Sequence, residues 1–459
     1  AMTIHSWHKA YNCTVALSAK SKSQTLQIAL RLFSLFVSFL SFPMALHYSG
    51  SRNFGLFIII TSSMAILTIS DFGIGLGLQS ALILAGRKRD KPQVARLLSD
   101  AIVTSLTASI CVVIIISTAI FLFDWKSVFH LESEEINIFK LSALLGCLGL
   151  FLTVNGIIYQ KILISYNRFT LIAVLNAAQT ILSSGLLVIS ASTKQPLVAM
   201  VLAQLLVPGI FNLLGLFLVL TRYDLLKLLI LRQSFKLGTI WSTFLRGRLF
   251  LVLQVTTLLS FQIDNLLIGR YFSPESVAVF GLAWKIASVP VIVGSIYLAS
   301  FWSEILDIVF KPQFTGAIRI SLLKYTRDVA ILAVVYGFVF ITLQDEIGRK
   351  ILGDTPGWDS TLILLAIVFA IFSCLLQPVT IVLNSLHCEK FLVKLALVST
   401  ISNVALSFYL TKYQNLLFGP FVGSIMTMAL VLIPCYVYWI RSKIETDVSN
   451  FKTKVAHEN

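Results

Sequence analysis

Long apolar runs alternate with short polar segments along almost the whole chain of 459 residues. In the first half these runs fall at about 26–48, 54–85, 98–123, 137–160, 170–191 and 197–220. In the second half they fall at about 248–272, 276–310, 320–343, 360–386, 392–411 and 417–440. A helix that crosses a bilayer needs roughly 20 mainly apolar residues. The pattern therefore predicts an all-α, multi-pass membrane protein with about twelve transmembrane helices.

Between the two halves, residues 221–247 place Arg and Lys among Leu and Ile, which is typical of a helix lying on an anionic membrane surface. We expect an N-terminal six-helix bundle over 1–220, a basic cytoplasmic linker over 221–247, a C-terminal six-helix bundle over 248–440 and a cytoplasmic tail over 441–459. An offset of about 222 residues brings Phe57 onto Phe280 and Arg96 onto Arg319, as expected of an internal repeat. Two such bundles would meet around a central cavity.

Composition and charge support the membrane class and set the topology. The chain is 57% hydrophobic and 12% charged, with a mean hydropathy of +0.87. Its net charge of +15 could indicate nucleic-acid binding, but the cations gather in alternate loops, such as 87–89, whereas the loop at 132–135 is acidic. This asymmetry and an even number of spans predict that both termini are cytoplasmic, and we expect no nucleic-acid partner.

Catalytic and metal-binding motifs are missing from the sequence. No CxxC pair or His/Cys cluster indicates a metal site. No Walker A, HExxH or GxSxG motif is present, and no loop is long enough for a catalytic domain. We therefore expect a transporter with no cofactor and no metal centre, rather than an enzyme.

Ionisable side chains within apolar runs are functional candidates, because they are costly in lipid unless they face a bundle interior or a wet cavity. Arg31 in the first run and Asp71 in the second are both expected near the cytoplasmic third, where they can pair. Asp264 and Lys285 are both expected about 12–14 Å from the outer end of the seventh and eighth spans, where they too can pair. Arg270 lies nearer the outer boundary.

Arg31, Lys285 and Arg270 are the candidate substrate-binding residues, because a cation in a cavity that excludes water attracts phosphate. A purely structural ion pair is the alternative for Arg31 and Lys285, and a boundary anchor is the alternative for Arg270. Asp71 and Asp264 can hold these cations in place, or bind H⁺ or Na⁺ and so couple transport to an ion gradient. Simple neutralisation of the basic groups is the other interpretation of the two aspartates.

Several short segments resemble one family of membrane proteins. They are Ser70–Gly75, Ala95–Leu98, Gln262–Gly269, Ser276–Ala283, Asn384 with Ile401–Asn403, and Gly419–Ser424. Together they are similar to polysaccharide flippases of the Wzx type, over nearly the whole chain. The resemblance implies the multidrug/oligosaccharidyl-lipid/polysaccharide exporter fold in a bacterial inner membrane.

The implied activity is transfer of an undecaprenyl-pyrophosphate-linked oligosaccharide, such as an O-antigen repeat unit, from the cytoplasmic to the periplasmic leaflet by alternating access. The implied partners are this lipid-linked substrate, membrane lipids and other glycan-assembly proteins. A cation-coupled multidrug antiporter of the same fold would favour an acidic cavity. A membrane-embedded glycan polymerase would present a large outer loop, and the longest outer loops here, near 124–136 and 344–359, are short.

Overall fold

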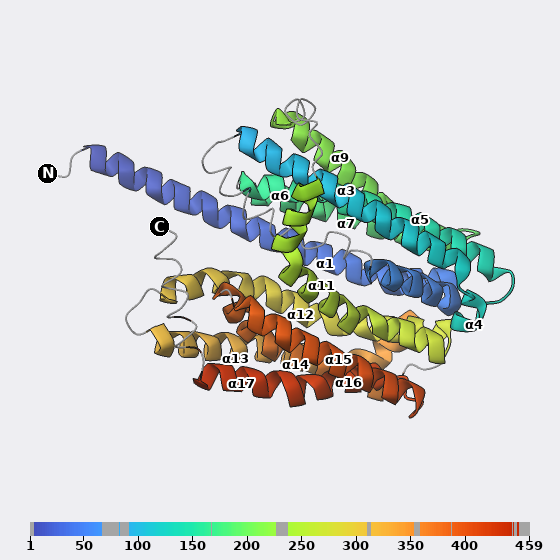
Figure 1. The fold of residues 1–459 in the computed structure, drawn as a ribbon. Helices are drawn as coiled ribbons and strands as arrows, with labels where there is room; N and C mark the ends of the chain where they lie inside the picture. Colours follow the sequence, from blue (N-terminus) through green and yellow to red (C-terminus); the bar gives the residue numbers. More distant parts are fainter. Residues whose placement is uncertain are drawn as a thin grey trace.

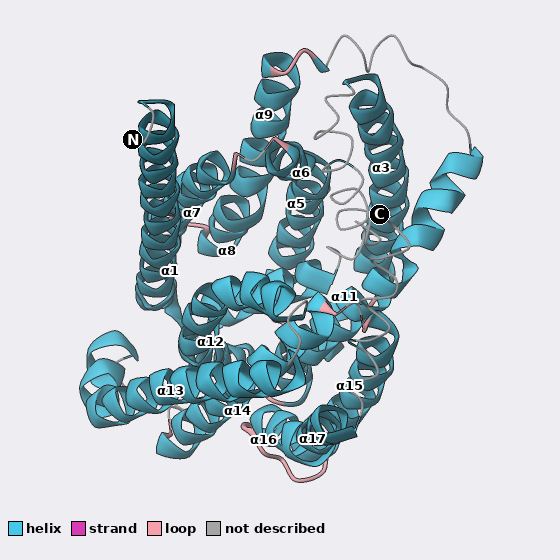
Figure 2. Ribbon diagram, turned by 90° about the vertical axis from the view of Figure 1, so that its left-hand side faces the viewer, coloured by secondary structure: helices cyan, strands magenta, loops and turns pink. Residues whose placement is uncertain are grey.

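The computed structural model describes residues 4–66, 82, 91–166, 168–225, 237–309, 314–352, 359–386, 388–442, 444 and 448. All regular structure in these ranges is helical (Figures 1 and 2). Asp71, the segment Ser70–Gly75 and most of the predicted tail lie outside the described residues.

The first helix, α1, runs from Ile4 to Ile66 and is bent at Gly50, which has φ 78° and ψ 158°. Glycine adopts this backbone conformation without the strain that a Cβ atom would cause. The bend separates two arms, which correspond to the first predicted span and the start of the second. Eleven helices in the described part of the chain are long and apolar enough to cross a membrane, and one of them, at Thr25–Ala65, contains both arms. The prediction of an all-helical membrane protein is confirmed.

The remaining helices follow in two series. The first is α3 (Lys91–Leu122), α4 (Trp125–Phe129), α5 (Glu135–Gly156), α6 (Ile158–Ser165), α7 (Phe169–Ala191), α8 (Pro196–Val201), the π-helical segment η2 (Leu202–Leu206) and α9 (Val207–Arg222). The second is α11 (Leu237–Tyr271), α12 (Pro274–Val309), α13 (Phe314–Leu352), α14 (Ser360–Ser385), α15 (Glu389–Lys412), α16 (Gly419–Thr427), the π-helical segment η3 (Met428–Leu432) and α17 (Ile433–Ser442). Helix α11 begins inside the segment predicted as a linker, of which 226–236 lies outside the described residues.

With α1 added to the first series, the two halves repeat the same order of elements, and the two arms of α1 correspond to α11 and α12. Helix α13 begins 223 residues after α3, and η3 begins 226 residues after η2. Both π-helical segments interrupt the last span of their half. The sequence offset of about 222 residues thus corresponds to a repeat in the structure.

Helix α1 belongs to the N-terminal bundle and lies at its boundary with the C-terminal bundle, where it packs against both α7 and α12 (Figures 1 and 2). The start of α1 and the end of α17 lie at one end of the molecule, which we call the terminal end. The opposite end, which contains Gly50 and α4, is called the distal end.

Buried apolar side chains form three clusters that show how the bundles meet. One cluster joins both bundles toward the distal end, where Phe57 and Ile59 of α1 pack with Phe280 of α12. A second, around Tyr159, belongs to the N-terminal bundle alone, and a third, around Trp439, belongs to the C-terminal bundle alone. The bundles therefore share one core toward the distal end and have separate cores toward the terminal end.

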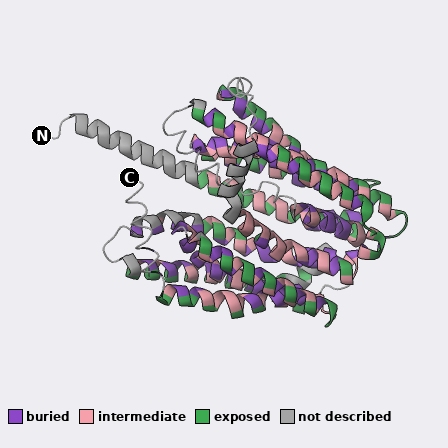
Figure 3. Ribbon diagram, in the orientation of Figure 1, coloured by how far each residue is buried: buried purple, intermediate pink, exposed green. Residues whose placement is uncertain are grey.

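The outer faces of both bundles are largely apolar. Large exposed hydrophobic side chains include Ile115, Phe338 and Ile401. In Figure 3, exposed residues lie along the outer sides of the helices. Since such a surface would be costly in water, it is consistent with helices that contact lipid.

Small residues allow α5 and η2 to approach closely. A Cβ atom added to Gly149 would lie 2.5 Å from a backbone carbon of Leu205, whereas one added to Gly185 would meet no atom within 4 Å. We predict that Gly149→Ala destabilises the protein by about 1–3 kcal/mol, as overpacking does. Gly185→Ala is the matched control and should leave the melting temperature in detergent unchanged or slightly raised. Equal melting temperatures for the two variants would contradict this packing.

Candidate functional site

Arg52, just after the bend in α1, joins the two bundles at the distal end. Its Nε donates to Glu135 Oε1 at 2.6 Å and its Nη2 donates to Glu135 Oε2 at 2.8 Å. Its Nη1 donates to Glu275 Oε1 of α12 at 3.2 Å. A third carboxylate, that of Glu132, lies 3.4 Å from Nη2. We call these four residues the Arg52 cluster. Because Glu135 belongs to one bundle and Glu275 to the other, the cluster ties the bundles together through charge-assisted hydrogen bonds.

Neighbouring contacts close the same end. A Cβ atom on Gly55 would lie 1.7 Å from the carbonyl oxygen of Pro274, so α1 and α12 are in backbone contact there. Asn265 of α11 donates to the Ser62 hydroxyl of α1 at 2.8 Å. The Arg270 guanidinium donates to the carbonyl of Ser127, in α4. Arg270 therefore lies exposed at the distal end.

Lys285 of α12 lies farther from the distal end, at the boundary between the bundles. Its Nζ donates to the Ser38 hydroxyl of α1 at 2.9 Å and lies 4.3 Å from the centre of the Phe42 ring. Within the described residues no ion pair includes Lys285. Lys285 lies eleven residues into α12, or ~16 Å along the helix, which is near the middle of a bilayer core.

Arg31 shares the face of α1 that contacts Lys285. It precedes Ser38 by seven residues, so it lies two turns and ~10 Å closer to the terminal end on the same side of the helix. Its side chain is exposed. The two cations therefore form a row from the middle of the molecule toward the terminal end.

The predicted pair of Asp264 and Lys285 is not formed. Asp264 is 3% exposed and lies close to the Ser407 hydroxyl of α15, whereas Lys285 points to α1. The two helices are rotated so that these side chains face different neighbours, α15 for Asp264 and α1 for Lys285. The predicted partner of Arg31, Asp71, lies outside the described residues.

Asp264 belongs to a buried polar group inside the C-terminal bundle. Its Oδ1 has no hydrogen-bond partner among the described residues. Ser407 donates to Asn403 Oδ1 at 3.2 Å, and so does Ser424 of α16. The amide of Asn403 donates in turn to the carbonyl of Ser260. An unsatisfied carboxyl oxygen among hydroxyl and amide oxygens can accept a proton or help to bind a small cation.

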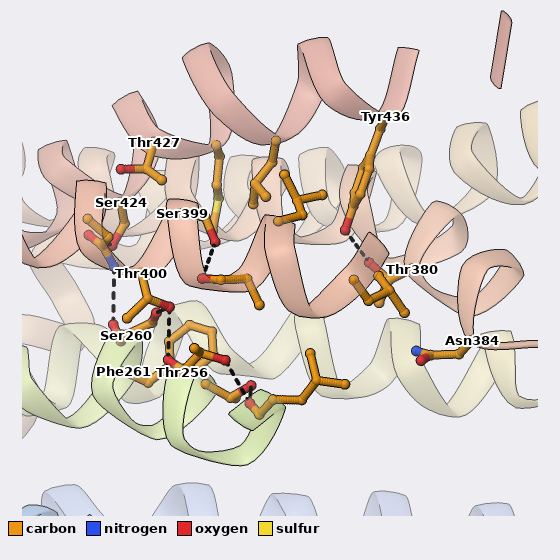
Figure 4. Close-up of a pocket in the computed structure, with 18 residues that line it drawn as sticks. Thr256, Ser260, Phe261, Thr380, Asn384, Ser399, Thr400, Ser424, Thr427 and Tyr436 are labelled. Atoms are coloured by element: carbon orange, nitrogen blue, oxygen red, sulfur yellow. Dashed lines mark hydrogen bonds between the residues drawn. The ribbon is translucent and has the colours of Figure 1, made fainter. Parts of the chain in front are cut away.

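A cavity of about 360 Å³ adjoins this group, between α11, α14, α15 and the α16–α17 segment (Figure 4). The cavity leaves no motif in the sequence, because its polar residues are single Ser, Thr, Asn and Tyr side chains spread over four spans. The Arg52 cluster was also missed. The acidic loop at 132–135 was the available signal, but sequence alone does not show which cation it faces.

No protein-family model and no curated protein matches the chain. Solved structures do. An inward-facing multidrug resistance MATE family transporter of the MOP superfamily has a TM-score of 0.67 and 18% identity, covering 94% of this chain and 96% of that one. An outward-facing one has a TM-score of 0.59 and 16% identity, with the same coverage. The lipid II flippase MurJ, inward closed, has a TM-score of 0.64 and 14% identity, covering 93% of this chain and 90% of that one. The chain has the multi-pass helical membrane fold that these proteins share.

The Arg52 cluster leads to a prediction about the distal end. Glu275→Gln removes the only carboxylate that the C-terminal bundle contributes to the cluster, so the distal end should open more often. Spin labels on Lys194→Cys and Gln414→Cys, at exposed distal positions of the two bundles, would measure this as a larger population of long distances. Glu132→Gln is the matched control, because Glu132 is exposed and lies in the same bundle as Arg52. Identical distance distributions for the two variants would count against the role of Glu275.

Proposed function

We propose that the protein is an alternating-access flippase that moves an undecaprenyl-pyrophosphate-linked oligosaccharide, of the O-antigen type, from the cytoplasmic to the periplasmic leaflet of a bacterial inner membrane. The observation that carries this proposal is Lys285, a cation at mid-depth between two bundles, with no carboxylate partner among the described residues. A cation held by a hydroxyl and an aromatic ring keeps its charge available to an anionic ligand.

The charge distribution supports the direction of transport. Exposed cations such as Arg168, Arg222 and Lys390 lie at the terminal end, whereas the acids of the Arg52 cluster lie at the distal end. The positive-inside rule assigns the terminal end to the cytoplasm. Separate cores at that end and a shared core at the other correspond to an inward-facing state. The higher TM-score of the inward-facing than of the outward-facing transporter agrees with this assignment.

Transport then needs no covalent chemistry. The pyrophosphate approaches from the terminal end along Arg31 and reaches Lys285, where less water remains and the attraction between charges is stronger. The polyprenyl chain stays in lipid. The terminal ends of the bundles close together and the contact between Arg52 and Glu275 breaks, so that the head group is exposed at the distal end. The fold shared with the lipid II flippase MurJ supports this scheme.

Asp264 is the proposed coupling residue, for H⁺ or Na⁺. Its carboxyl group is buried, has an unpartnered oxygen and lies near hydroxyl and amide groups of α15 and α16. Binding of a cation there would remove an isolated charge from the interior of the C-terminal bundle. It would also favour closer contact between α11 and α15.

A multidrug antiporter is the second candidate function. The buried carboxyl of Asp264 and the fold shared with a MATE transporter favour it. A cationic drug would, however, meet Lys285 and Arg31 at the boundary between the bundles, where like charges repel. The pyrophosphate-linked substrate is therefore the better match.

The cations give a direct prediction for export. Lys285→Ala or Arg31→Ala should reduce surface glycan at least about tenfold, because a lost charge-assisted contact to phosphate costs roughly 1.5–3 kcal/mol. Lys285→Arg should retain much of the activity. Lys194→Ala, at an exposed distal loop, is the control. The assay is surface glycan per amount of protein in the membrane. Normal export by both alanine variants would rule out this binding role.

The proposed coupling role of Asp264 predicts that its substitution abolishes the response of transport to an ion gradient. Asp264→Asn keeps the size of the side chain and one acceptor oxygen but cannot carry the charge that binds a cation. In proteoliposomes, flipping of the lipid-linked glycan should no longer respond to an imposed H⁺ or Na⁺ gradient. Asp359→Asn, at the exposed N-terminus of α14, should respond normally. A gradient response in Asp264→Asn equal to that of the control would remove Asp264 from the coupling mechanism.

A further inference from the structure

The cavity of about 360 Å³ within the C-terminal bundle, which we call the hydroxyl-lined cavity, is lined by uncharged polar and apolar side chains. Its lining contains the side chains of Thr256, Ser260, Thr400 and Asn403, together with Leu and Met residues and two aromatic rings, Phe261 and Tyr436. None of its 18 lining residues carries a charge. Its volume of about 360 Å³ falls within the ~300–1,000 Å³ range of small-molecule sites.

Part of the hydrogen-bonding capacity of this cavity is unused. Thr427 is 4% exposed, lines the cavity, and its hydroxyl has no hydrogen-bond partner among the described residues. Figure 4 shows the Asn384 amide at the cavity with no hydrogen bond to the other residues drawn. Buried polar atoms are normally paired, and the Thr427 hydroxyl oxygen is itself inaccessible, so the Asn384 amide is the group that a ligand in the cavity can pair with.

The backbone around Thr427 is also unusual. Thr427 immediately precedes η3, the π-helical segment Met428–Leu432, and Met428 and Leu432 both line the cavity. A π-helical turn costs stability relative to an α-helical turn and occurs frequently at functional sites. Here it widens the helix where it borders the cavity.

The cavity lies close to the proposed pyrophosphate site. The ring of Phe261, which lines the cavity, contacts the ring of Trp284 edge-to-face at 5.9 Å. Trp284 is next to Lys285 in α12. In the proposed substrate, sugars are attached directly to the pyrophosphate, so a sugar-binding site must lie near the cation that holds the phosphates.

We propose that the hydroxyl-lined cavity is a subsite for an uncharged sugar ring of the lipid-linked oligosaccharide. A pyranose offers hydroxyl groups that donate and accept hydrogen bonds and an apolar face that packs against aromatic rings, and the lining residues match both features. This subsite rests on the proposed function. It adds an uncharged sugar-binding site to the cationic site for the phosphates. The two sites together would select a neutral sugar over an acidic or cationic head group.

Site-specific photocrosslinking in the protein's own host tests this subsite. Diazirine analogues of methionine and leucine replace Met428 at the cavity and Leu35, which lies one turn after Arg31 on α1. The matched control is the same analogue at Met426, two residues from Met428 and 38% exposed on the outside of α16. The host's lipid-linked glycan is metabolically radiolabelled, and labelled sugar on the purified protein is counted after irradiation.

We expect labelled sugar at positions 428 and 35 and not at 426. Label at 35 alone would overturn the sugar subsite and leave the flippase function in place. Absence of label at all three positions would contradict both the sugar subsite and the flippase function.

A second pair of variants tests the cavity amide. Asn384→Leu should reduce the label at position 428 roughly two- to tenfold, the effect of one hydrogen bond. Thr411→Val should not reduce it, because Thr411 is buried and does not line the cavity. An equal loss in the two variants would contradict a direct contact between Asn384 and the sugar.

Discussion

The contact between the two bundles at the distal end is the constraint on which the rest of the structure depends. There Arg52 holds carboxylates from both bundles, Gly55 allows backbone contact with Pro274, and apolar residues of α1 and α12 form a shared core. Toward the terminal end each bundle has a core of its own. The shared core extends along α12 to Ile286 and Ala287, so Lys285 lies beside it, with its ammonium group held between Ser38 and the Phe42 ring of α1.

The charged groups have separate roles in this arrangement. Lys285 and Arg31 offer positive charge at the boundary of the bundles, and Asp264 offers negative charge inside the C-terminal bundle. Their separation prevents them from neutralising each other, which a direct ion pair would do. In the proposed mechanism, a change in the charge state of Asp264 would alter the packing of α11 against α15 without removing the charge of Lys285.

Much of the fold, but less of the site, could be predicted from the sequence. Apolar run length indicated the spans, since a bilayer sets a minimum helix length, and the cost of placing a cation in lipid marked Lys285 as a candidate site residue. The partner of Lys285 was predicted wrongly, because a continuous apolar run does not fix the rotation of a helix: Asp264 faces α15, and Lys285 faces α1. The Arg52 cluster and the hydroxyl-lined cavity depend on contacts between residues more than 80 positions apart, such as Arg52 with Glu135.

Binding of the substrate's phosphates at Lys285 is the central claim, and native mass spectrometry of the purified protein tests it most directly. The wild-type protein, released from detergent with undecaprenyl pyrophosphate, should retain one lipid per chain, and Lys285→Ala should retain far less at the same lipid concentration. Undecaprenol, which lacks the phosphates, should bind both proteins equally weakly. Equal retention of undecaprenyl pyrophosphate by the wild-type and Lys285→Ala proteins would contradict the account.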